Sequence, residues 1–156
     1  MEDREVGRRG QLAAVYERIA AVAEGEDDAI ALMATMACEL YQGVASYDWV
    51  GFYRRVGPET LKVGPYQGTH GCLTIRFSQG ICGRCAASGE VQNIPDVRVD
   101  PAHLACSATT RSELVVPVRD AAGSLIAVLD IDSDRPANFS DVDVAALERM
   151  LQLFAR

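Results

Sequence analysis

The sequence predicts an α+β fold in which helices pack against a central antiparallel β-sheet. Two stretches with helical periodicity come first, several short strand-like segments follow, and one further helical stretch closes the chain. That order of elements is typical of an α+β domain. The chain has 156 residues, of which 49% are hydrophobic, so it can bury one good core. We therefore expect a single domain over residues 1–156.

The first two helices are predicted from the spacing of apolar residues. Residues 8–24 carry apolar side chains three and four positions apart, and Gly25 ends the pattern. Acidic residues 26–28 favour the start of a second helix, because negative charge stabilises a helix N-terminus. The stripe expected on the first helix is Leu12, Val15, Ile19 and Val22. The face expected on the second, which makes Cys38 a core residue, is Ile30, Met33, Ala34, Ala37, Cys38 and Tyr41.

From Trp49 onward the apolar pattern becomes that of strands. A turn is expected around Gly57, and Gly89 closes a short helix at residues 80–87. Residues 95–110 form a long loop, and loops of this length inside a compact domain are usually functional. The strands expected in this part of the chain are 49–53, 61–63, 73–77 and 91–94.

The clearest hairpin pairs residues 113–118 with 125–131 through a turn at 120–124. Both of its strands are apolar enough to be central in the sheet. The closing helix is expected to start at Ser140, because Asp143 three positions later completes a capping-box signal. The stripe expected on that helix is Val144, Leu147, Leu151 and Phe154.

Composition excludes several classes of partner. The net charge of −7 offers no basic surface for phosphate backbones, so we expect neither nucleic acid nor an anionic membrane as a partner. The N-terminal segment lacks the apolar core of a signal peptide, and no apolar run approaches the ~20 residues of a spanning helix. We expect a soluble, cytoplasmic protein. In that reducing compartment, clustered cysteines indicate catalysis, redox sensing or metal binding.

Four of the five cysteines lie between positions 72 and 106. Cys106 is in the long loop, where a thiolate can act as a nucleophile, and His103 is close enough in sequence to favour that thiolate. Cys82 lies at a predicted helix start, where the helix dipole lowers the pKa of a thiol. Cys82, or Cys72 on a glycine-flanked segment, could attack a sulfenic acid at Cys106 and form a disulfide. Cys85 is expected to be a buried helix residue.

Three acids accompany these thiols. Asp130 and Asp132 alternate with apolar neighbours, so both carboxylates point to one face of their strand, and Glu113 opens the partner strand. Clustered carboxylates can hold an ammonium group, and crowding raises the pKa of one of them so that a proton stays available. Trp49 and Tyr53 share a strand face and could wall a ligand pocket.

A zinc site is the main alternative reading of the cysteines. Together with two histidines, they could supply a tetrahedral nitrogen and sulfur set. Structural zinc sites generally pair two short Cys-x-x-Cys knuckles, whereas only one such pair, Cys82 and Cys85, occurs here. The residues that such a site would draw on are Cys72, Cys82, Cys85, Cys106, His70 and His103.

Six segments of the chain together form a recognisable pattern. They are Asp48-Trp-Val-Gly-Phe-Tyr53, Gly64-Pro-Tyr-Gln-Gly68, Gly80-Ile-Cys-Gly83, His103-Leu-Ala-Cys106, Ser112-Glu113 and Val128-Leu-Asp-Ile-Asp-Ser133. With these segments the sequence resembles the free methionine-(R)-sulfoxide reductases, which are single GAF-domain enzymes. The resemblance extends from about residue 10 to residue 155, and the three cysteines and the Leu-Asp-Ile-Asp-Ser segment make it specific. Cys85 departs from the family pattern, in which a small non-thiol residue is usual.

The resemblance implies that free L-methionine-(R)-sulfoxide is reduced to methionine by a homodimeric enzyme that needs no cofactor beyond an external dithiol, thioredoxin. It implies that Cys106 is the nucleophile and that Cys72 and Cys82 are the other redox cysteines. Glu113 or Asp132 would donate the proton to the sulfoxide oxygen. The substrate pocket that it implies consists of Trp49, Tyr53, Glu113, Asp130 and Asp132. A GAF module that binds a small ligand, or senses redox state without turnover, is the alternative function.

Overall fold

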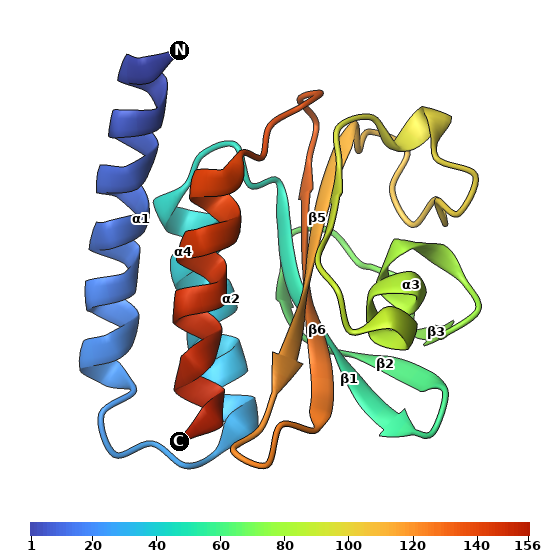
Figure 1. The fold of residues 1–156 in the computed structure, drawn as a ribbon, viewed down its shortest axis with the longest axis horizontal. Coiled ribbons are helices and arrows are strands. Elements are labelled where there is room, and N and C mark those ends of the chain that lie inside the picture. The colour runs from blue at the N-terminus through green and yellow to red at the C-terminus, as the bar shows by residue number, and fades with distance from the viewer.

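The structure, a computed structural model, describes residues 1–156 and is built around a six-stranded antiparallel sheet in the order β3-β2-β1-β6-β5-β4 (Figure 1). The expected α+β class is therefore confirmed. The strands are β1 (Trp49–Gly57), β2 (Thr60–Gln67), β3 (Thr74–Arg76), β4 (Gln92–Ile94), β5 (Ser112–Arg119) and β6 (Leu125–Ser133). The helices are α1 (Glu2–Val22), α2 (Ala29–Gly43), α3 (Gly80–Ser88) and α4 (Asp141–Leu151), with short 3₁₀ turns η1 (Val97–Val99) and η2 (Gln152–Ala155).

Helices α1, α2 and α4 lie together on one face of the sheet (Figure 1). Helix α2 packs on β1 and β2, α4 packs on β5, and α1 packs on both of these helices. The larger hydrophobic core fills this side of the molecule, and it joins all three helices to the central strands. None of the helices combines the length and the apolar character needed to cross a membrane.

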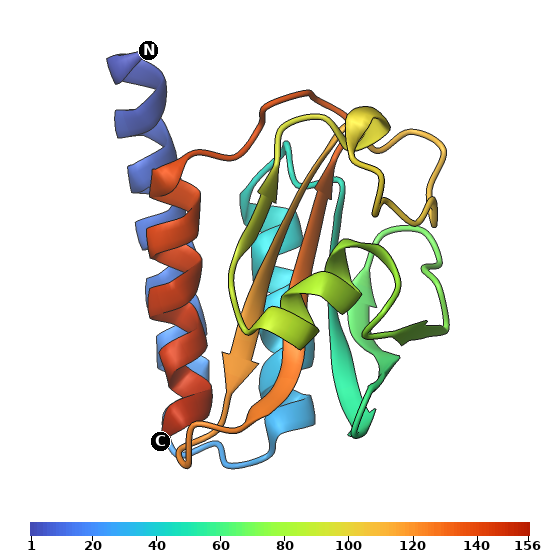
Figure 2. The same cartoon turned by 45° about the vertical axis from the view of Figure 1, so that its right-hand side comes forward.

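The opposite face of the sheet carries α3 and the loop segments that flank it (Figure 2). A second, smaller apolar cluster lies here, between α3 and the strands. Gly83 allows the close approach of α3 to the chain before it, because a β-carbon at this position would lie 2.9 Å from the carbonyl oxygen of Phe77. Because the apolar cluster on the α3 face is the smaller of the two, packed side chains fill this face only in part and leave room for a site.

The first helix, α1, runs from Glu2 to Val22 rather than over the predicted residues 8–24, whereas ends of the other three helices follow the signals expected from the sequence. The side chain of Asp28 accepts hydrogen bonds from two backbone N–H groups in the first turn of α2. Ser140 and Asp143 form a complete capping box at the start of α4. Gly89 ends α3 in the left-handed conformation, with φ of 70°.

The buried faces of two helices differ from the predicted ones. In α2, Ile30 and Ala34 are exposed and Cys38 is only partly buried, because the helix is apolar on more than one stripe and its long side chains face the sheet. In α1, Val22 is 63% exposed, because Ala23 takes the core-facing position. The residues that α2 buries are Leu32, Met33, Met36, Ala37 and Leu40.

All six strands have bounds other than those predicted. β2 continues through Gly64 and Pro65, which lie together opposite Phe52 where the β1–β2 register shifts. Such a bulge accommodates a proline that a regular ladder would exclude. β1 is likewise longer than expected, whereas β3 is shorter and leaves Leu73 72% exposed.

Candidate active site

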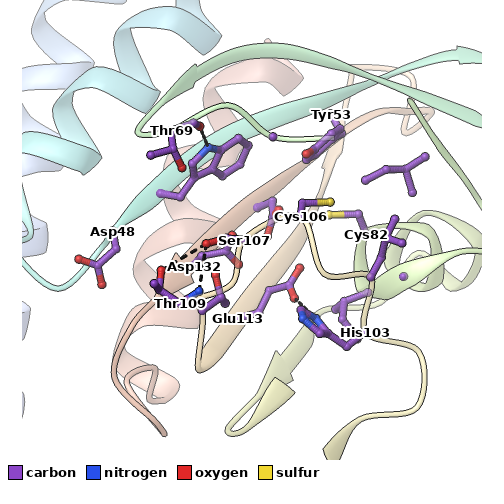
Figure 3. Close-up of a pocket in the computed structure, with 18 of the residues that line it drawn as sticks. Asp48, Tyr53, Thr69, Cys82, His103, Cys106, Ser107, Thr109, Glu113 and Asp132 are labelled. Atoms are coloured by element: carbon purple, nitrogen blue, oxygen red, sulfur yellow. Dashed lines mark hydrogen bonds and ion pairs between the residues drawn. The ribbon is translucent and has the colours of Figure 1, made fainter. Parts of the chain in front are cut away.

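A cavity of about 210 Å³ opens on the α3 face of the sheet (Figure 3). It is smaller than the roughly 300–1,000 Å³ of pockets for drug-sized ligands, so it suits a small molecule. Strands β1, β3, β5 and β6, helix α3 and the loops next to them contribute to its wall. The cavity gathers every residue of the predicted site except Cys72, namely Trp49, Tyr53, Cys82, Cys106, Glu113, Asp130 and Asp132.

Strand register explains why the three acids meet. Glu113 on β5 pairs with Asp132 on β6, which pairs with Trp49 on β1, so the three side chains form one row across the sheet. Asp130 lies on the same face one row away, opposite Gly51. A β-carbon at Gly51 would collide with the Trp49 ring, so the glycine leaves that ring room to lie over the strand.

Burial keeps protons on these carboxyl groups. Glu113 is 6% exposed and Asp130 is 5% exposed. Burial, and then the charge of Asp132, raise the pKa of Glu113 to about 8. Burial, followed by the charge of Glu113, raises the pKa of Asp130 well above its usual value. The pKa of Asp132 is raised in the same way, by burial and then by the charge of Asp130. The cavity therefore holds carboxylic acids that can donate protons near neutral pH.

Aromatic rings form the opposite wall. The Trp49 ring stacks against Tyr53 and Tyr66, at centroid distances of 5.9 and 5.4 Å. Its Nε1 donates a 2.6 Å hydrogen bond to the carbonyl oxygen of Thr69, which fixes the ring against the loop that leads to Cys72. Burial raises the pKa of Tyr53 far above neutral, so its hydroxyl remains a proton-bearing donor. The cavity thus presents an apolar wall facing an acidic one.

Cys106 and Cys72 form a disulfide, with their Cα atoms 5.5 Å apart. The disulfide joins the long loop to the segment before β3, and Cys106 lines the cavity beside the acids. One of the two partners expected for Cys106 is therefore in bonding contact with it. Cys85 is fully buried, as expected, and Cys38 and Cys82 are also free thiols.

The prediction of a lowered pKa for Cys82 is wrong. The residue is 3% exposed, and burial, followed by the charges of Asp130 and Glu113, raises the pKa of its thiol well above the usual value. The helix dipole stabilises a thiolate less than desolvation and three nearby acids destabilise it. In this arrangement Cys82 is a protonated thiol that faces the carboxyl cluster.

The cysteines are not arranged as a tetrahedral zinc set. Cys72 and Cys106 are joined to each other, and the Cys82 sulfur lies instead with carboxylate oxygens of Glu113 and Asp130, all within 4.8 Å of one another. That trio is the one group whose geometry could hold a metal ion. It offers one sulfur and two oxygens, unlike the cysteine and histidine sets of structural zinc sites.

His103 lies beside an acid of the cavity. Its Nδ1 lies 3.7 Å from Oε2 of Glu113, so the ring faces the acid (Figure 3). The sequence interpretation also missed Asp48, Ser107 and Thr109, which line the cavity near its acidic side. Short polar residues in loops carry no periodic signal, and only the folded backbone brings these three together.

Comparison with known proteins shows the family of this chain. The GAF domain model matches residues 28–156. The free methionine-R-sulfoxide reductase of Escherichia coli K12 is 37% identical over 131 residues, which cover 84% of this chain and 78% of that protein.

The chain belongs to the free methionine-(R)-sulfoxide reductase family of GAF-domain proteins.

Solved structures agree with this membership. The free methionine-R-sulfoxide reductase of Neisseria meningitidis, determined in complex with its substrate, superposes with a TM-score of 0.89 at 34% identity, covering 95% of this chain and 88% of that one. A putative GAF sensor protein from Burkholderia vietnamiensis superposes with a TM-score of 0.87 at 36% identity, covering 94% and 92%. Fold similarity alone thus does not separate a reductase from a sensor, and the chemistry of the cavity has to do so.

Proposed function

We propose that this reductase-family protein reduces free L-methionine-(R)-sulfoxide to L-methionine through a thiol and disulfide cycle. The observation that carries the proposal is the meeting of a disulfide-forming cysteine, Cys106, with protonated carboxyl groups in one amino-acid-sized cavity. Sulfoxide reduction needs both a sulfur nucleophile and an acid for the departing oxygen.

In the first step the Cys106 thiolate attacks the sulfoxide sulfur while Glu113 or Asp132 gives a proton to the oxygen. The oxygen passes to Cys106 as a sulfenic acid, the carboxyl becomes a carboxylate, and methionine leaves. The thiol of Cys72 then attacks the sulfenic sulfur, which releases water and forms the disulfide. Cys82, which borders the same cavity, is the second candidate for this resolving step.

The substrate would lie between the two walls of the cavity. Trp49 and Tyr53 would pack against the methyl and methylene groups of the substrate, and the acids would hold its free ammonium group. An ammonium group favours the ionised form of a neighbouring acid, while another acid keeps its proton. A residue within a peptide has no ammonium group, so the free amino acid is the expected substrate.

An external dithiol must reduce the disulfide before the next cycle, and we propose thioredoxin in this role. No cofactor enters the proposed chemistry. We also propose that the protein acts in the cytosol, under oxidative stress, as a homodimer. Thioredoxin and its reductase should support NADPH oxidation that depends on the sulfoxide, and sedimentation should give twice the chain mass.

The test is to incubate the pure protein with free methionine-(R,S)-sulfoxide and dithiothreitol, and to measure methionine and both epimers by chromatography. We expect methionine to form while the R epimer disappears and the S epimer persists. Ligand binding by calorimetry without any methionine would instead favour the alternative, a GAF module that binds or senses without turnover.

A further inference from the structure

His103 occupies the boundary between the cavity and the outer surface. It lines the cavity that holds Glu113, and it also lines a shallow hollow on the outside, formed by α3 and residues 101–104. The side chain is 18% exposed, whereas that of Glu113 is 8% exposed. The Nδ1 atom is buried without a hydrogen-bond partner, and it lies 3.7 Å from Oε2 of Glu113 (Figure 3). A small movement of the ring would bring the two groups within hydrogen-bond distance.

The backbone around His103 is anchored to α3. Arg84 donates two hydrogen bonds to the carboxylate of Asp100, at 2.8 and 3.2 Å, and a third to Gln92 on the far side. The same carboxylate accepts from the backbone N–H of Ala102, and the N–H of His103 donates to the backbone oxygen of Asp100. A forked guanidinium contact fixes both distance and orientation, so the imidazole is held toward the cavity.

Glu113 needs a route by which to regain its proton. Where Glu113, rather than Asp132, donates the proton in the proposed reaction, it becomes a carboxylate once per turnover, and it is almost closed off from solvent. On β6 it faces Asp130 and Asp132, and on α3 it faces Cys82, all groups whose raised pKa makes them hold their own protons.

The other charged groups around Glu113 are Arg84 on α3 and Asp100 in the long loop. Arg84 does not release protons near neutral pH. The contact with Arg84 lowers the pKa of Asp100, so its carboxyl group stays ionised. His103 alone combines a position beside Glu113, partial exposure and a side chain that exchanges protons near neutral pH.

We propose that His103 delivers protons from solvent to Glu113 between turnovers, with Arg84 and Asp100 as positioning residues. The inference rests on the proposed function. The imidazolium gives its Nδ1 proton to the carboxylate, which regenerates the neutral carboxyl group and leaves a neutral ring protonated at Nε2. The ring then turns to bring Nδ1 to solvent, where it takes up a proton, and turns back. No electrons move in this step, and the net change is one proton taken from solvent.

The acidities of the two groups agree with this direction of transfer. Burial lowers the pKa of His103, which makes the imidazolium a better proton donor. Burial raises the pKa of Glu113 to about 8, which makes its carboxylate a better acceptor. Transfer from the ring to the acid is therefore downhill.

The kinetic test separates the first turnover from later ones. Reduced wild-type protein, His103→Ala and a loop control, Arg98→Gln, are mixed with sulfoxide and saturating dithiothreitol near pH 8. Arg98 pairs with Asp96 in the same loop, and it lines neither the cavity nor the outer hollow. We expect His103→Ala to keep the initial burst of methionine but to lose about tenfold in steady-state rate, and added imidazole to restore it. The control should match wild type.

Other outcomes would overturn the proposal. An unchanged steady-state rate would exclude the delivery role, and so would a lost burst that imidazole does not restore. A shift in the pH dependence of Cys106 alkylation by iodoacetamide would mean that the histidine acts on the thiol.

A second readout is independent of turnover, so it separates this inference from the proposed function. The ring nitrogens of His103 are titrated by NMR in wild-type protein and in Glu113→Gln. In wild-type protein we expect the chemical shifts of the ring nitrogens to change in a step near pH 8, and in Glu113→Gln we expect this step to be absent. Identical titrations in the two proteins would overturn the proposal even if methionine is formed.

Discussion

Glu113 and Asp132 pair in register across the β5–β6 hairpin, so two carboxyl groups from adjacent strands project into one cavity. The charge of Asp132 is, after burial, the main cause of the raised pKa of Glu113. Paired strands place facing side chains about 5 Å apart, which is close enough for each acid to influence the charge of the other. The hairpin thereby builds a proton donor from residues that are ordinarily ionised.

Glu113→Gln should lower kcat roughly 100- to 10,000-fold, because the amide keeps the shape of the carboxyl but cannot donate the proton. KM should change much less. In wild-type protein, the rate of methionine formation should fall as the pH rises through about 8, where Glu113 loses its proton. Steady-state kinetics across pH checks this expectation, and a variant with near wild-type kcat would assign the acid to Asp132.

Stability should also depend on Glu113. Its pKa is about 8 in the folded protein against an ordinary 4.5, so between these values the folded state binds a proton that the unfolded state has lost. The resulting stabilisation is complete below pH ~4.5 and declines as the pH rises toward 8, by at most about 5 kcal/mol. Urea unfolding of oxidised protein at several pH values measures this slope. Glu113→Gln should show a flatter slope, and an equal or steeper one would contradict the assignment.

The effect of each cysteine substitution on methionine formation should depend on where that cysteine lies in the site. Cys106→Ser should abolish methionine formation. Cys72→Ser should still form methionine once, leaving a sulfenic acid that dimedone traps, but its steady-state rate should fall at least about tenfold if Cys82 is the poorer partner. Cys85→Ala is the matched control, since Cys85 is buried outside the cavity. Full activity in Cys106→Ser would move the nucleophile to another residue.

Gly71→Ala should disturb the site without a general loss of fold. A β-carbon at Gly71 would lie 2.8 Å from the Tyr53 hydroxyl and 3.0 Å from the Trp49 ring, so the segment before Cys72 must shift. We expect Gly71→Ala to form the Cys72–Cys106 disulfide more slowly and to have a higher KM for the sulfoxide. Gly7→Ala in α1 is the control, because no atom lies within 4 Å of its new methyl group. That change should raise stability by about 0.5–1 kcal/mol and leave kinetics unaltered.

Much of this site was predictable from sequence because strand alternation is a strict rule. The two-residue spacing of Asp130 and Asp132, and the hairpin that brings Glu113 opposite Asp132, follow from local pattern alone. Turn and cap signals at Asp28, Gly89 and Ser140 likewise depend on a few adjacent residues.

Features that depend on three-dimensional packing were predicted less well. The apolar surface of α2 extends over more than one stripe, so only contact with the sheet selects Leu32 and Met36 over Ile30. At Cys82, the local helix dipole favoured a low pKa, whereas burial against acids from another strand reversed the direction. The contact of His103 with Glu113 likewise joins segments that sequence spacing does not place.

The proposed cycle requires Cys106 to remove the oxygen from free methionine-(R)-sulfoxide and then to pair with Cys72. Single-turnover chemistry tests it most directly: fully reduced protein is mixed with excess sulfoxide in the absence of any reductant, and methionine and disulfide-linked peptides are quantified together. We expect about one methionine per chain, formed together with the Cys72–Cys106 disulfide. Methionine without a disulfide that includes Cys106, or no methionine at all, would contradict it.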